Sequence, residues 1–185
     1  MKPIILASSS PRRSELLTKH NIEFIIEFDS IEEVLDESLA LSVRLEKLAY
    51  DKGIGVSQRH PEAITISADT MVCLGETMLG KAKNRQEAKE MLENQSGKLQ
   101  TVYTAIAIFE DNQVKTYCDK ADVWFKKLNT KDIEEYLDTE EWIGKAGAYA
   151  IQGIGNILVE RISGDKETII GLPVRIIESY LHSKK

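Results

Sequence analysis

The sequence has 185 residues, of which 42% are hydrophobic and 29% charged, a composition typical of one folded domain with its own core. Its net charge of −6 argues against nucleic acid or acidic membranes as partners, because binding to either relies on basic surfaces. No hydrophobic run approaches the length of a membrane span, and residues 4–7 are too short for the core of a signal peptide. We expect a cytoplasmic protein that can still bind a small polyanion where its cations converge.

The cysteines and histidines show no metal-binding pattern. Cys73 and Cys118 are singletons, which predicts reduced structural thiols. His20, His60 and His182 are scattered along the chain, so no zinc motif is available and we expect surface histidines.

The first distinctive segment is a serine-rich loop between a predicted strand, residues 3–7, and a predicted helix, residues 11–19. Ser10 is expected to cap this helix, and Pro11 suits its first turn, where a missing N–H costs nothing. Arg12 and Arg13 add two fixed charges to the exposed N–H groups, which indicates a site for a multiply charged anion. An ordinary capped helix with solvated arginines is the alternative.

Residues 22–28 are expected to form a second strand, and an acidic segment, residues 29–37, follows. Such a segment is usually a solvated loop or helix face. The alternative is that one carboxylate turns inward to bind a divalent metal, since hard cations take oxygen ligands.

A helix is predicted over residues 41–56, where Lys52 lies on the same stripe as Leu45 and Leu48. Lys52 could extend to solvent at the helix end, or supply a point charge to a phosphate. The sequence leaves both interpretations open.

Asp69 and Thr70 interrupt two apolar runs, residues 63–68 and 71–74. The first run is predicted to be a strand that ends at Asp69. An unpaired carboxylate is expensive to bury, and functional carboxylates often lie at strand ends in α/β folds. We therefore favour a functional Asp69 over a turn residue.

Residues 75–82 match the glycine and lysine spacing of a Walker loop, but Ala82 replaces the hydroxyl that would hold magnesium. Residues 77–79 fit the return strand of a hairpin better, and the next predicted helix, residues 85–93, begins too late. The Walker interpretation is rejected, and Lys81 remains a candidate phosphate contact.

The second half of the chain alternates strands and helices. Strands at 101–109 and 114–125 are expected to pair through a turn at 111–112, with Trp124 and Phe125 in the core. Thr130 is expected to cap a helix ending near residue 137. Further predicted elements are a strand at 157–162 and a C-terminal helix after Gly171-Leu172-Pro173. This mixture indicates an α/β domain with a mixed sheet.

Four glycines among residues 144–155 imply close backbone approaches. Gln152 in this segment can both donate and accept hydrogen bonds, as reading a base edge requires, although its amide could equally be satisfied by backbone.

Taken together, the chain resembles the Maf family of nucleoside triphosphate pyrophosphatases over essentially its whole length. The matching segments, in order and well separated, are Leu6–Leu17, Ala68–Val72, Gly80-Lys81, Lys145–Tyr149, Ile151–Gly153 and Gly171–Pro173.

The resemblance implies one domain over residues 1–185, with an elongated α/β fold like that of inosine triphosphate pyrophosphatases and a cleft between two lobes. It implies hydrolysis of a nucleoside triphosphate to the monophosphate and pyrophosphate with a divalent cation such as Mg²⁺, Mn²⁺ or Co²⁺. A homodimer is a further expectation of the family.

The resemblance also implies roles for single residues. Asp69 matches the proposed proton acceptor, and Glu33 together with Asp69 matches the metal ligands. The sequence looks like the branch that acts on dTTP and UTP, rather than the branch that acts on 7-methyl-GTP, at the arginine pair, at Thr70 and in the Ile-Gln-Gly segment. The implied substrate-binding residues are Ser8, Arg12, Arg13, Lys52, Lys81 and Lys145, and those implied in base selection are Arg12, Thr70 and Gln152.

Three positions depart from the family pattern: Ala82 replaces a proline, Gln100 a histidine and Lys166 an aromatic residue. A competing interpretation is a nucleotide-binding regulator, since the family is also associated with arrest of septum formation. Such a regulator would not need a carboxylate pair, so Glu33 and Asp69 favour the enzyme. A Walker-type kinase or ATPase is a weaker alternative because of Ala82.

Overall fold

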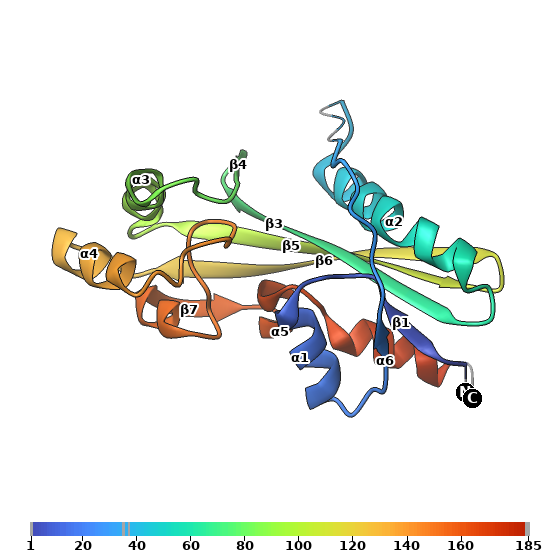
Figure 1. Cartoon of the computed structure of the whole chain (residues 1–185). Helices are drawn as coiled ribbons and strands as arrows, with labels where there is room; N and C mark the ends of the chain where they lie inside the picture. Colours follow the sequence, from blue (N-terminus) through green and yellow to red (C-terminus); the bar gives the residue numbers. More distant parts are fainter. Residues whose placement is uncertain (1, 35, 37, 184–185) are drawn as a thin grey trace. The chain divides into compact units, whose positions relative to one another are not determined.

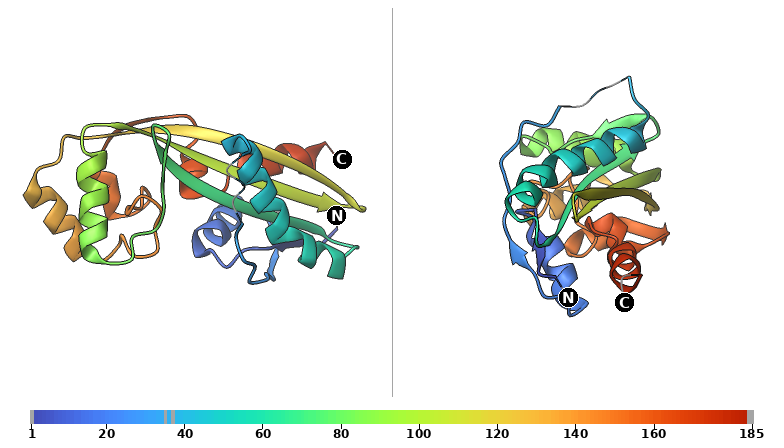
Figure 2. Two further views of the ribbon diagram at one scale, coloured as in Figure 1. Left: turned by 90° about the horizontal axis from the view of Figure 1, so that it is seen from above. Right: turned by 90° about the vertical axis from the view of Figure 1, so that its right-hand side faces the viewer.

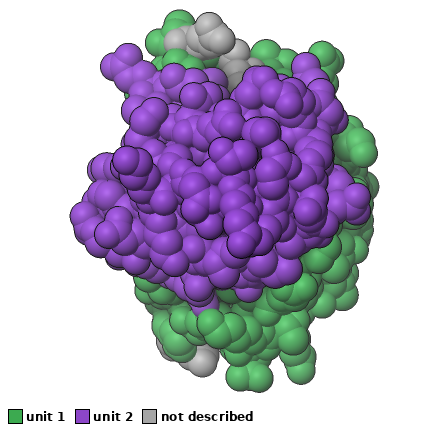
Figure 3. Space-filling view, turned by 90° about the vertical axis from the view of Figure 1, so that its left-hand side faces the viewer, with its two compact units in different colours: residues 1–70, 104–119, 171–185 green, residues 71–103, 120–170 purple. Residues whose placement is uncertain are grey.

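A computed structural model describes residues 2–34, 36 and 38–183. In these residues seven strands form one mixed sheet accompanied by six α-helices, which confirms the α/β class (Figure 1). The chain divides into two compact units that alternate along the sequence (Figure 3). Unit 1 comprises residues 1–70, 104–119 and 171–185, and unit 2 comprises residues 71–103 and 120–170. The elongated two-lobed form, its cleft and the single-domain organisation stay predictions.

Unit 1 holds β1 (Ile4–Leu6), α1 (Pro11–Lys19), β2 (Ile25–Ile26), α2 (Leu41–Arg59) and α6 (Val174–His182). Unit 2 holds β4 (Thr77–Leu79), α3 (Arg85–Gln95), α4 (Thr130–Asp138), the 3₁₀ helix η1 (Ile154–Leu158), β7 (Val159–Ser163) and α5 (Lys166–Ile170). Three long strands contribute residues to both units: β3 (Ile64–Leu74), β5 (Leu99–Glu110) and β6 (Gln113–Phe125).

The strand order is β2-β1-β3-β5-β6-β7, and β4 pairs with β3 outside this path. Strand β1 is parallel to β2 and to β3, whereas the β3–β4 and β6–β7 pairs are antiparallel. The two-residue turn between β5 and β6 consists of Asp111 and Asn112, whose φ angles of 52° and 59° fit a tight hairpin turn. The predicted β5–β6 hairpin is thus confirmed.

In unit 1, α2 lies on one face of the strands, and α1 and α6 lie on the other (Figure 2). Helix α2 approaches β3 and β5 closely at Gly53, where a Cβ atom would lie 2.4 Å from the Phe109 ring and 2.5 Å from Ser67 Oγ. Ser67 also donates a hydrogen bond to the carbonyl of Ala49. Because side chains alternate along a strand, Asp69 lies on the same face of β3 as Ser67 and points towards α2.

In unit 2, α3 and α4 are joined by ion pairs from Arg85 and Lys89 to Glu134, at 2.6 Å each. Their apolar faces belong to a core in which the Phe125 and Tyr149 rings pack edge to face at 4.8 Å. This core confirms the prediction for Phe125.

Several predictions about local structure are wrong. Strand β3 continues through Asp69 to Leu74 instead of ending at Asp69. Helix α4 is capped by Asn129, which forms a capping box with Asp132, rather than by Thr130. Trp124 is only half-buried and packs under the guanidinium of Arg161 at 3.4 Å. The predicted strand over residues 22–28 shrinks to β2, whose two isoleucines are exposed.

Candidate functional site

The serine-rich loop leads from β1 into α1 and is fixed through Ser8. Ser8 is 7% exposed, and its hydroxyl accepts hydrogen bonds from the Ser10 N–H at 3.2 Å and from Arg13 Nη1 at 2.9 Å. Ser10 occupies the N-cap position and Pro11 the first turn, but Ser10 makes no capping hydrogen bond with its side chain. The predicted N-cap position of Ser10 is confirmed, but the capping hydrogen bond is not formed, and the Ser8 hydroxyl is the one that orders the loop.

Arg13 is fixed by three hydrogen bonds to the protein. Its Nε donates to the Gly171 carbonyl at 2.9 Å, and its two Nη atoms donate to Ser8 Oγ and, at 3.3 Å, to Thr70 Oγ1. Burial lowers the pKa of Arg13 to about 10, a shift that the nearby Asp69 carboxylate opposes. Arg13 therefore stays charged near neutral pH and holds the loop, β3 and the segment before α6 together.

Arg12 differs from its neighbour. Its guanidinium is half-buried, and burial lowers its pKa while Glu15 opposes that shift. Nothing in the described part of the chain forms a hydrogen bond with it. A partly desolvated guanidinium in the first turn of a helix is well suited to bind an anion.

Lys52, Asp69 and Glu33 form a compact charged cluster on the α2 face of β3. The Lys52 ammonium donates to Asp69 Oδ1 and lies 2.7 Å from Glu33 Oε1. Asp69 is 8% exposed, and the Lys52 side chain is 20% exposed. The interpretation that Lys52 extends to solvent is wrong, because α2 continues to Arg59 and its Lys52 side chain turns towards β3.

Thr70 follows Asp69 on β3 and points to the opposite face, towards α1. Its Oγ1 lies 2.9 Å from Thr104 Oγ1 on β5, in addition to its contact with Arg13. Sequence reasoning missed Thr104, which is fully buried. The available signal was a lone hydroxyl in an otherwise apolar run, residues 104–109.

The cluster fits a divalent metal by its donor set. The carboxylates of Glu33 and Asp69 converge on one positive charge, the ammonium of Lys52. Mg²⁺ is commonly held by one or two carboxylates together with substrate phosphates and water. No group of three or more His, Cys, Asp or Glu side chains in the described residues forms a fuller metal site.

Residues 29–34 form a loop that is mostly exposed, as the first interpretation predicted, but the Glu33 carboxylate turns towards Lys52, so its role as a metal ligand stays a prediction. Asp29 at its start pairs with Arg59 at 2.9 Å. Leu35 and Glu37 lie outside the described residues.

In unit 2 the backbone segments that carry Lys81 and Lys145 lie side by side. Lys81 forms a backbone bridge with Ala146, and the Gly147 N–H donates to the Gly80 carbonyl at 3.1 Å. Buried Gln95 donates to the Gly147 carbonyl at 2.8 Å, a contact that sequence reasoning missed. Residues 77–79 form β4, which confirms the rejection of the Walker loop.

Gln152 is exposed in unit 2, and its side chain makes no hydrogen bond with the described residues. The alternative in which backbone satisfies its amide is therefore not observed. Gln100 presents the opposite case: it is fully buried, and neither atom of its amide has a hydrogen-bond partner in the described chain.

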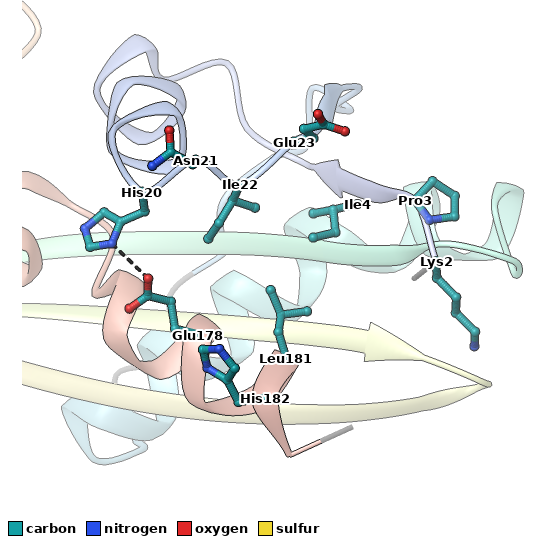
Figure 4. Close-up of a pocket in the computed structure, with 10 residues that line it drawn as sticks. All are labelled: Lys2, Pro3, Ile4, His20, Asn21, Ile22, Glu23, Glu178, Leu181 and His182. Atoms are coloured by element: carbon teal, nitrogen blue, oxygen red, sulfur yellow. Dashed lines mark hydrogen bonds and ion pairs between the residues drawn. The ribbon is translucent and has the colours of Figure 1, made fainter. Parts of the chain in front are cut away.

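A separate hollow of about 480 Å³ lies in unit 1 (Figure 4). His20 lines it and pairs with Glu178 at 3.0 Å. The hollow contains none of the site residues predicted from the sequence.

These features define an α/β protein with a cationic loop at a helix start and a carboxylate pair bridged by lysine. The Maf-like protein family matches residues 3–184, and the chain belongs to this family. It is 43% identical to a dTTP/UTP pyrophosphatase of Bacillus velezensis, over 94% of this chain and 92% of that protein. It is 41% identical to one of Desulforamulus reducens, with shares of 94% and 92%, and 43% identical to one of Clostridioides difficile, with shares of 92% and 89%.

Proposed function

We propose that this protein is a nucleoside triphosphate pyrophosphatase that hydrolyses dTTP and UTP to the monophosphate and pyrophosphate. The observation that carries the proposal is the convergence of Asp69, Glu33 and Lys52 in unit 1. Relatives that are about as long as this chain and are named dTTP/UTP pyrophosphatase support the same substrates.

The negative charge of a triphosphate opposes attack on phosphorus, so catalysis depends on charge neutralisation and positioning. Arg12 and Lys52 supply mobile positive charge to the phosphates, and the Ser8 O–H is a donor to them. Arg13 acts mainly by fixing Ser8 and Thr70, because three of its N–H groups already bind the protein. We assign Lys81 and Lys145 as further phosphate ligands from their motifs.

Asp69 is the proposed proton acceptor for the attacking water. Glu33 and Asp69 are the residues that would hold a divalent cation of the Mg²⁺, Mn²⁺ or Co²⁺ type. Such a cation, when bound, supplies Lewis-acid stabilisation of phosphate charge. The flexible stem of Lys52 would allow its ammonium to contact phosphate in place of these carboxylates.

Base selection is assigned to Arg12, Thr70 and Gln152. A pyrimidine edge needs both donors and acceptors, and the exposed amide of Gln152 offers both. A site that hydrogen-bonds this edge rejects bases that leave its polar groups unpaired.

The decisive experiment replaces Asp69 by Asn and measures pyrophosphate release from dTTP and UTP. The substitution keeps the shape of the side chain and removes the base, so we expect a loss of activity of about 100-fold or more in a folded protein. Glu33→Gln should lower activity at limiting metal, whereas Glu32→Gln, an exposed neighbour, serves as the matched control. Full activity in Asp69→Asn would refute the assignment.

A panel of canonical and modified triphosphates with Mg²⁺, Mn²⁺ or Co²⁺ ranks the substrates and the metals. Tight dTTP binding without turnover under all these conditions would instead support a nucleotide-binding regulator. Phosphate release from ATP would support a kinase or ATPase.

We further propose a cytoplasmic location and a homodimer. Both cysteines are free thiols, which fits a reducing compartment. No helix in the described residues is long and apolar enough to cross a membrane. Ile25 and Ile26 are exposed on the edge strand β2, and Phe28 is exposed just after it. Together they form an apolar surface of the kind that dimer contacts cover. Cell fractionation tests the location, and light scattering of the wild type and of Ile26→Lys tests the homodimer.

A further inference from the structure

The loop that carries Gln152 is held by two side chains near the end of α4. The Ala150 N–H donates to the Tyr136 hydroxyl at 3.3 Å, and this hydroxyl donates to Glu141 Oε2 at 3.0 Å. On the far side of Gln152, the N–H groups of Ile154 and Gly155 donate to the two Glu141 oxygens at 2.9 and 2.7 Å. Tyr136 and Glu141 thus anchor the backbone on both sides of Gln152.

The loop packs closely against Glu141 at Gly153. A Cβ atom there would lie 1.8 Å from Glu141 Oε1. At Gly155 a Cβ atom would lie 2.7 Å from the Ala150 carbonyl oxygen. Gly155 is therefore required by the loop's own backbone, whereas a side chain at Gly153 would displace the Glu141 carboxylate from the loop.

The charge arrangement makes this contact strong. Two N–H groups at the start of η1 and one hydroxyl all donate to a single carboxylate, and charge-assisted hydrogen bonds are stronger than neutral ones. Tyr136 is fully buried, and its burial together with the Glu141 charge raises the pKa of its hydroxyl. The hydroxyl therefore remains a donor at neutral pH.

Gln152 itself is exposed and makes no hydrogen bond within the described chain. Its position is consequently set by the backbone on which it lies. We propose that Glu141 is a positioning residue for base selection, which fixes Gln152 by clamping the loop over residues 150–155. This inference rests on the proposed function, in which Gln152 contacts the base.

The test compares Glu141→Gln with Glu140→Gln, an exposed neighbour whose side chain has no partner in the described residues. A glutamine presents one acceptor oxygen in place of two, so one N–H of the loop loses its partner. We expect kcat/KM for dTTP to fall about tenfold, mainly through KM, with little change for purine triphosphates. Glu140→Gln should behave like the wild type.

Two further measurements separate positioning from general stabilisation. If Glu141 acts through Gln152, the double variant Glu141→Gln/Gln152→Ala should discriminate between bases no worse than Gln152→Ala alone. Hydrogen exchange at the amides of Ile154 and Gly155 should accelerate in Glu141→Gln and stay unchanged in Glu140→Gln. A lower melting temperature with unaltered base preference would overturn the inference.

The outcomes also distinguish this inference from the proposed function. A wild type that releases no pyrophosphate from any pyrimidine triphosphate would overturn the proposed function and the selectivity role with it. An active, selective wild type whose Glu141→Gln variant keeps its selectivity would overturn the inference alone. Unchanged amide exchange in that variant would refute the clamp whatever the activity.

Discussion

Lys52 donates a hydrogen bond to the carboxylate of Asp69, so the proposed proton acceptor is paired with a cation. Glu33 completes the arrangement from an exposed loop, 2.7 Å from the same ammonium. Lys52 and a divalent metal would compete for the same two carboxylates. The lysine therefore neutralises the two carboxylates that would hold a metal.

Lys52→Met should tighten metal binding while it lowers turnover. Removal of the ammonium leaves two carboxylates without their competing charge, and we expect Mn²⁺ affinity to rise about tenfold. The loss of a phosphate contact should lower kcat/KM for dTTP by about 100-fold. Titration calorimetry with Mn²⁺ checks the first effect, with Lys47→Met on the exposed side of α2 as the control. Weaker Mn²⁺ binding in Lys52→Met would contradict this account.

Arg12→Lys and Arg13→Lys should have different consequences although both retain the charge. Arg13→Lys removes the guanidinium that makes three hydrogen bonds to the protein. We expect this variant to lose about 1–3 kcal/mol of unfolding free energy and to lose activity on every nucleotide. Arg12 has no such bonds in the described chain, so its variant should keep its stability within about 0.5 kcal/mol and shift base preference. Urea unfolding and substrate panels measure both. Equal stability losses would show that the hydrogen bonds of Arg13 contribute little.

Local patterns in the sequence predicted much of this structure. Pro11 and the apolar spacing after it predicted a helix over residues 11–19, which is confirmed at both ends. The Asp111-Asn112 pair predicted a hairpin because these residue types tolerate positive φ. Patterns of this kind depend on a few neighbouring residues, so they can be recognised in the sequence without knowledge of the fold.

Contacts between distant segments explain what the sequence did not predict. An unpaired carboxylate inside a strand is unfavourable, so Asp69 was expected at a strand end; its partner Lys52 lies on a helix 17 residues earlier. Arg13 binds Thr70 and Gly171, which are 57 and 158 residues away. The clamp by Glu141 was missed because a single glutamate after a helix has no pattern that marks it.

The hydroxyls of Thr70 and Thr104 should be energetically coupled. They lie 2.9 Å apart between β3 and β5, and Thr104 is fully buried. Replacement of either by Val keeps the volume but leaves the other hydroxyl with one partner fewer, so each single variant should lose about 1 kcal/mol of unfolding free energy. The double variant should lose less than the sum, with a coupling energy of roughly 0.5–1.5 kcal/mol. Strict additivity in a double-mutant cycle would show that this contact is not a net stabilising hydrogen bond.

Buried tyrosines should make the protein less stable at alkaline pH. Burial raises the pKa of Tyr136 and of Tyr149 above the ordinary value of 10.0. Above about pH 10 the unfolded chain loses these protons while the folded chain keeps them, so stability is complete below that pH and falls as the pH rises. Each such group contributes a slope of about 1.4 kcal/mol per pH unit.

Tyr136→Phe isolates one of these protons. Its unfolding free energy should be lower than that of the wild type at pH 8, because Glu141 and the Ala150 N–H lose a partner, but should fall less steeply between about pH 10 and 11. Tyr117→Phe, at a half-buried position on β6, is the control. Urea unfolding across this pH range measures the slopes. Parallel curves for Tyr136→Phe and the wild type would mean that Tyr136 ionises in the folded protein as readily as in the unfolded chain, and that its hydroxyl is not the buried donor to Glu141 on which the clamp depends.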